Sequence, residues 1–139
     1  MGGTTLLSDL QMAVMRILWT RGEATVAEVH EALTDARGLA PTTVATVLSR
    51  LERRRLVDHR RQGRQFVYRT LVTDQDVRRS AIDELTERVF QGDVAGLVSQ
   101  LLDVRDMSSG DLARVKAMIE TREKALDEPP RGTPDDDDE

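Results

Sequence analysis

The chain of 139 residues contains no cysteine and few aromatic residues. Without cysteine it can form no disulfide, thiolate metal site or cysteine nucleophile. Only 3% of its residues are aromatic while 39% are hydrophobic, so aliphatic side chains must fill the core. No apolar run reaches the roughly 18 residues of a membrane span, and the N-terminus lacks the pattern of a secretion signal. We therefore expect no membrane insertion and a cytoplasmic location.

Residue types that support catalysis or hold metals are also scarce. The two histidines, His30 and His59, are far apart in the sequence, and His30 has no second histidine or cysteine close by. There is no glycine-rich phosphate-binding loop, and the carboxylates are scattered over surfaces that we expect to be solvated. The sequence predicts no enzyme, no metal and no cofactor, with His30 in a structural or surface role.

The net charge of −5 hides two segments of opposite sign. Residues 127–139 hold seven acidic residues against Arg131, whereas the other 126 residues carry 19 basic and 18 acidic ones. Within residues 37–69 there are nine arginines against two acidic residues, Glu52 and Asp58. A basic block in a nearly neutral body indicates a polyanionic partner. We expect residues 127–139 to be a disordered acidic tail.

Helical periodicity and capping residues predict two helices before the basic block. Ser8 with Gln11 starts the first helix, which ends at Arg21-Gly22 and places Trp19 on an apolar stripe as a core residue. Thr25 with Glu28 starts the second helix, over residues 26–36.

A third helix over residues 41–54 carries the feature that most directly indicates function. Pro41 suits its first position, and Val44, Val47, Leu48 and Leu51 mark one buried face. The outer face is small and hydroxyl-bearing near its start and cationic near its end. The side chains predicted to contact DNA from this helix are Thr42, Thr43, Thr46, Ser49, Arg50, Arg53 and Arg54. Two helices, a turn containing glycine and a third basic helix follow the helix-turn-helix order.

A basic β-hairpin is predicted next, with strands over residues 56–61 and 65–71 and a turn over residues 62–64. Arg60, Arg61 and Arg64 would contact phosphate from this hairpin. The predicted fold is mainly α with a small β-hairpin, with a DNA-binding domain over residues 1–72.

Residues 73–126 predict a helical dimerisation region. Thr73 with Asp76, and Ser108 with Asp111, are capping starts, and Gly92 breaks the first of these helices. The three helical segments form too thin a bundle to bury their own apolar faces, so we expect them to fold against a second copy in a homodimer. The residues assigned to this interface are Val94, Leu97, Val98, Leu101, Leu102, Leu112, Val115 and Ile119.

Several segments resemble the penicillinase-repressor (BlaI/MecI) family of winged helix-turn-helix transcriptional repressors. The matching segments are residues 10–19, 26–30, 42–51 (the recognition helix), 63–68 (the wing), 92–102 and 108–119, and the resemblance spans residues 8–122. Thr43, Thr46 and Arg50 match the staphylococcal members, whereas Thr42 and Ala45 stand where those have basic residues.

The resemblance implies a homodimer that represses genes by binding a palindromic operator on double-stranded DNA. In several relatives a membrane-bound sensor metalloprotease relieves repression by cutting the short apolar helix that corresponds to residues 94–102. Their cut falls at an Asn-Phe pair, and Gln100-Leu101 stands in the matching place. A copper-responsive branch senses metal through C-terminal cysteines, which this chain lacks.

Two alternatives remain open at the level of sequence. One is a winged-helix regulator of another family that responds to a small ligand, which a pocket lined by Val89, Phe90 and Leu97 would favour. The other is a winged-helix module for protein interactions. That module predicts an apolar or mixed outer face on the third helix, and the arginines over residues 50–55 argue against it.

Overall fold

The computed structural model describes residues 6–104 and 106–128. Contacts divide the chain into two compact units, residues 1–93 and 94–139. The first unit contains α1 (Asp9–Arg21), β1 (Glu23–Thr25), α2 (Val26–Arg37), α3 (Pro41–Arg53), β2 (Val57–Gln62), β3 (Gln65–Thr70) and α4 (Asp74–Arg88). The second contains α5 (Val94–Val104) and α6 (Ser109–Asp127). The acidic tail predicted over residues 127–139 lies, beyond Glu128, outside the described residues.

The predicted helix starts are confirmed by their hydrogen bonds. The Ser8 hydroxyl accepts from the Gln11 N–H at 3.1 Å while the Gln11 side chain accepts from the Ser8 N–H at 3.0 Å. Thr25 with Glu28 and Thr73 with Asp76 form the same reciprocal pairs. Each pair satisfies two N–H groups that the helix itself leaves without a partner.

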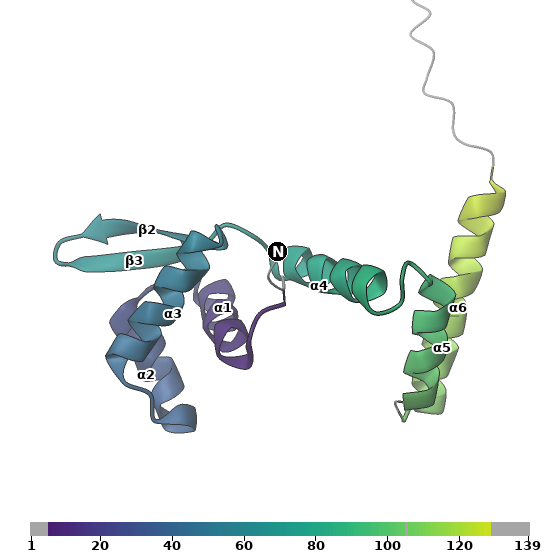
Figure 1. The fold of residues 1–139 in the computed structure, drawn as a ribbon, viewed down its shortest axis with the longest axis horizontal. Coiled ribbons are helices and arrows are strands. Elements are labelled where there is room, and N and C mark those ends of the chain that lie inside the picture. The colour runs from purple at the N-terminus through teal and green to yellow at the C-terminus, as the bar shows by residue number, and fades with distance from the viewer. Residues whose placement is uncertain (1–5, 105, 129–139) are drawn as a thin grey trace, which may run out of the picture. The chain divides into compact units, whose positions relative to one another are not determined.

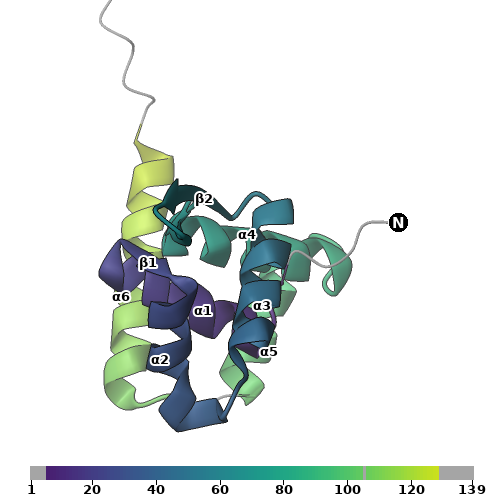
Figure 2. The ribbon, with the colours of Figure 1, turned by 90° about the vertical axis from the view of Figure 1, so that its left-hand side faces the viewer.

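Helices α1, α2 and α3 pack against one another, and the sheet lies against them (Figures 1 and 2). Their shared core is aliphatic except for Tyr68, as the scarcity of aromatic residues requires. Trp19 is half-buried against this core, and its indole N–H donates to the Val72 carbonyl at 2.9 Å. The buried core residues are Val14, Met15, Leu18, Ala24, Val29, Leu33, Val44, Val47, Leu48, Leu51, Val57 and Tyr68.

The sheet has three antiparallel strands in the order β1-β3-β2, rather than the two strands that the sequence predicted. Gly22, at φ 84°, turns the chain out of α1 so that Glu23 and Thr25 pair with Arg69 and Val67 of β3. Three residues between two helices are too few to show strand alternation, so periodicity gives no sign of β1.

The predicted bounds of the hairpin and of the third helix also shift slightly. The strands are 57–62 and 65–70, because Leu56 and Leu71 pair only through the Leu71 N–H and the Leu56 carbonyl. α3 ends at Arg53, with Arg54 as its C-cap, and Arg55 at φ 61° leads the chain out of the helix.

The helices after the wing leave much apolar surface uncovered. α4 and α6 bury none of their side chains, and α5 buries Leu97 alone. The exposed fractions of Val94, Leu101 and Ile119 are 61%, 49% and 49%. The structure places α4 in the unit that contains the wing; the domain boundary at residue 73 stays a prediction.

Candidate nucleic-acid interface

The outer face of α3 is set by the four aliphatic side chains on its inner face. Val44, Leu48 and Leu51 have no exposed surface and Val47 is 8% exposed, so the helix cannot rotate without exposing them. The opposite side therefore presents Thr42, Thr43, Thr46, Arg50 and Arg53, all exposed, with Ser49 half-buried.

This outer face is hollowed into a shallow cleft of about 350 Å³. Its lining combines two hydroxyls, two methyl groups and two guanidinium groups, from Ala45, Thr46, Ser49, Arg50 and Arg53. The Thr46 hydroxyl donates to the Thr42 carbonyl at 2.9 Å, which leaves its oxygen lone pairs and its methyl group to face a ligand. Small side chains allow a groove wall to approach closely, while the arginines can reach phosphates or base edges.

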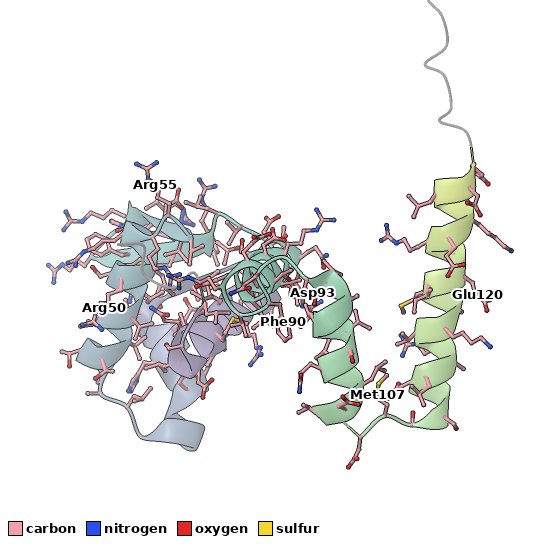
Figure 3. The ribbon with its side chains drawn as sticks, turned by 45° about the vertical axis from the view of Figure 1, so that its right-hand side comes forward. Arg50, Arg55, Phe90, Asp93, Met107 and Glu120 are labelled. Atoms are coloured by element: carbon pink, nitrogen blue, oxygen red, sulfur yellow. The ribbon has the colours of Figure 1, made fainter. Side chains whose placement is uncertain are left out.

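The arginines of α3 differ in their partners. Within residues 6–104 and 106–128, no carboxylate pairs with Arg50 or Arg53. Arg54 instead reaches toward α1, where its guanidinium donates to the Gln11 side chain at 3.4 Å. Figure 3 shows the side chains of Arg50 and Arg55 extending outward from α3 and from the turn after it. Arg50 and Arg53 are thus the cations that the cleft offers to an anion.

The wing is the hairpin of β2 and β3, closed by the two-residue turn Gly63-Arg64. Gly63 adopts φ 65°, which glycine takes without steric cost in such turns. Successive side chains of a strand point to opposite faces, so Arg60 and Arg61 face opposite sides of the wing.

The two faces of the wing carry different charge. On one face Arg60 donates to Glu23 at 2.8 Å, and Arg69 donates to Asp58 at 2.7 Å. The bond from Arg69 holds the pKa of Asp58 below its usual range, and the same bond raises the pKa of Arg69. This face is therefore neutralised by its own ion pairs. Within the described part of the chain no carboxylate pairs with Arg61 or Arg64.

Of the residues predicted to contact DNA, Thr46, Ser49, Arg50 and Arg53 thus line one cleft, and Thr42 and Thr43 lie one helical turn before it. Arg54 and Arg60 are instead hydrogen-bonded to Gln11 and Glu23. Sequence reasoning left out Arg55, which is exposed just after the helix. Its position directly after Arg53 and Arg54, in a run of three arginines, was the feature of the sequence that could have indicated it.

The described residues include no group of three or more His, Cys, Asp or Glu side chains that could hold a metal ion. In the same part of the chain, no helix combines the length and the apolar character needed to cross a membrane. His30 is half-buried, and its Nε2 donates to the Leu39 carbonyl at 2.6 Å, in keeping with a structural role.

A family model described as penicillinase repressor matches residues 7–121. The chain belongs to the penicillinase repressor family. The transcriptional regulator BlaI of Mycobacterium tuberculosis is 35% identical over 134 residues, covering 95% of this chain and 96% of that protein. The penicillinase repressor of Bacillus licheniformis is 24% identical over 114 residues, covering 82% of this chain and 89% of that protein.

Among solved structures, the DNA-binding domain of the repressor BlaI matches with 29% identity and a TM-score of 0.48, covering 55% of this chain and 93% of that domain. As a member of the penicillinase repressor family, the chain is a DNA-binding transcriptional repressor with a winged helix-turn-helix fold. These relatives are transcriptional regulators rather than enzymes.

Proposed function

We propose that this repressor binds a palindromic operator as a homodimer, with α3 of each subunit in the major groove. The observation that carries the proposal is the outer face of α3, which presents hydroxyls and unpaired guanidinium groups around one cleft. The major groove is wide enough to admit a helix. Thr43 and Thr46 contact base edges or thymine methyl groups, and Arg50 and Arg53 contact guanine or phosphate.

The wing contacts the DNA backbone beside that groove. Arg61 and Arg64 supply its phosphate contacts, because Arg60 is engaged with Glu23 on the other face. Phosphate contacts fix the register and give most of the salt dependence, whereas the few base contacts distinguish the operator from other sequences.

The apolar side chains of α5 and α6 form the dimer interface in this proposal. Their exposure in a single chain supports it, since large exposed apolar surfaces mark interaction sites. A two-fold homodimer is the commonest arrangement that covers such a surface. The residues assigned to the interface are Val94, Leu97, Val98, Leu101, Leu102, Leu112, Val115 and Ile119, of which Leu97 is buried and Val115 half-buried.

Release from the operator by proteolysis in the stretch 94–102 forms part of the same proposal. Gln100 and Leu101 are both exposed in α5 of the single chain. A cut between them by a membrane-bound sensor protease would separate α6 and the end of α5 from the DNA-binding unit. One half-site alone offers too few contacts for tight binding, so the cut would lower affinity.

The proposal is tested by selecting duplexes that bind the full-length protein from a random pool. We expect an inverted repeat whose half-sites are centred about one helical turn, or a simple multiple, apart. Enrichment of a single asymmetric site, or no enrichment, would contradict it.

A further inference from the structure

The cationic end of α3 contains one carboxylate, Glu52, between Arg50 and Arg53. A carboxylate beside a DNA backbone repels phosphate, so its presence on this helix requires a physical account. The structure supplies a partner from the wing, because Glu52 Oε1 is hydrogen-bonded to Nδ1 of His59 on β2. About a third of each side chain is exposed, at 32% for His59 and 33% for Glu52.

The ring of His59 also packs against the second strand of the wing. Its centroid lies 4.5 Å from that of Phe66 and 5.3 Å from that of Tyr68. Tyr68 is a core residue, and burial followed by the charge of Glu52 raises the pKa of its phenol. The ring therefore joins α3, the core and the outer half of the wing.

The contact between Glu52 and His59, called the joint below, lies close to Arg61, a wing arginine that has no ion pair among the described residues. Phe66 is paired in the sheet register with Arg61. Directly opposed side chains of neighbouring strands contact each other, so holding Phe66 through His59 restricts the position of Arg61 relative to α3.

We propose that Glu52 and His59 are positioning residues for DNA binding: they set the wing against the recognition helix, most firmly when His59 is protonated. The inference rests on the proposed function, in which α3 and the wing contact one DNA site together. With His59 protonated the pair is an ion pair that cancels the charge of Glu52. With His59 neutral, Glu52 keeps a net negative charge beside the phosphates.

The charged and titratable groups near the ring are few. Glu52 faces it from α3, the phenol of Tyr68 from β3, and the guanidinium of Arg61 lies two residues further along the same face of β2. On its own strand, Asp58 is held by Arg69 on the opposite face of the wing, and Arg60 is held by Glu23. The charge of His59 thus acts on Glu52, on the neighbouring Arg61 and on the approaching DNA.

The first test is the pH dependence of binding by the full-length protein. A fluorescein-labelled duplex from the selection above is titrated between about pH 6 and pH 7.5, within the range where histidines change charge. We expect the Kd to fall as the pH falls, by at most about tenfold per pH unit for each proton taken up. The chain has two histidines, so His59→Gln should flatten the profile while His30→Gln, the matched control, should keep it.

The second test uses Glu52→Gln, which keeps a hydrogen-bonding group at the same position without its charge. We expect this variant to bind more tightly than the wild type near the upper end of the pH range and to show a flatter profile. Because Glu52→Gln leaves the His59 ring in place, a flatter profile in this variant reports the loss of the charge and not a loss of folding caused by replacing His59.

The third test asks whether His59 acts through the wing. Arg61→Ala should cost less affinity in a His59→Ala background than in the wild type, by about two- to tenfold. The cost of Arg50→Ala, which lies on α3 itself, should be the same in both backgrounds.

The proposed role of Glu52 and His59 would be overturned if the Kd of His59→Gln depended on pH as steeply as that of the wild type. It would also be overturned if Arg61→Ala cost the same affinity in both backgrounds. Neither result would contradict specific DNA binding by the protein. Wild-type protein that does not prefer the selected duplex to a scrambled one at any pH would overturn the proposed function and the joint together.

Discussion

At the scale of single residues, Arg50 is the side chain on which DNA binding should depend most. It lines the cleft on α3, is exposed and has no carboxylate partner among the described residues. Arg50→Ala should weaken operator binding by about 1–3 kcal/mol, because a charge-assisted contact to DNA is lost. Fluorescence anisotropy measures this.

Arg88→Ala serves as the matched control for Arg50→Ala. It removes the same charge from α4, where Arg88 donates to Glu84 at 2.9 Å. Its affinity should stay close to that of the wild type. If Arg50→Ala binds as the wild type does throughout a salt titration, Arg50 makes no contact.

Adjacent wing arginines provide a second comparison, since they face opposite sides of the hairpin. Arg61→Ala should reduce the slope of log K against log salt by about one, because one phosphate contact is lost. Arg60→Ala should leave that slope nearly unchanged, because Arg60 is bonded to Glu23. Equal changes in the two slopes would show that the wing does not bind through the face that carries Arg61.

The outer residues of α3 could be predicted from the sequence because helical spacing separates Thr46 and Arg50 from the apolar positions. The pairing of Arg60 could not, since its partner lies 37 residues away on a strand too short to show alternation. The same holds for the joint between Glu52 and His59, which depends on how the wing folds back on α3.

At the scale of elements, α3 begins without a side-chain cap. Ala40 has the extended backbone of an N-cap, at φ −74° and ψ 149°, but no side chain that can accept from the first turn. Ala40→Ser should raise the free energy of unfolding by about 1 kcal/mol, because a serine hydroxyl can accept one of those N–H groups. Urea unfolding measures it, with Ala40→Val as a control that adds volume but no acceptor. A serine variant no more stable than the valine variant would contradict the expectation.

Helix starts were the most predictable elements, because a capping residue and its partner three positions later form a local signal. The hairpin was equally clear from its alternation and from Gly63. Strand β1 was missed, and the strand ends shifted by one residue, because both depend on pairing with β3 rather than on local sequence.

At the scale of the whole molecule, the exposed apolar side chains of α5 and α6 should join two copies. Leu101 is 49% exposed and lies one helical turn after the buried Leu97. Leu101→Lys should shift the protein toward monomer and weaken binding to a two-half-site duplex, because a charge would be buried without a partner. Analytical ultracentrifugation gives the mass.

Ser99→Lys is the matched control for Leu101→Lys, since it adds the same charge to the other side of α5. It should leave the mass and the affinity unchanged. A Leu101→Lys protein that remains a dimer would show that the interface lies elsewhere.

The sequence predicted that the helices after the wing form too thin a bundle to bury their own apolar faces, because no other apolar surface of the chain was expected to cover them. The structure bears this out in the exposure of Val94, Leu101 and Ile119. The inclusion of α4 with the wing was not predictable, since Trp19 bonds to the Val72 carbonyl just ahead of α4 through a long-range contact.

The most direct test of the central claim is an anisotropy titration of the full-length protein at two salt concentrations. It compares the selected duplex with a scrambled duplex of the same composition. We predict tight binding to the selected duplex that persists at the higher salt concentration, with binding to the scrambled duplex lost there. Equal binding to both duplexes that vanishes at the higher salt would contradict a sequence-specific repressor and leave the basic face as a non-specific anchor.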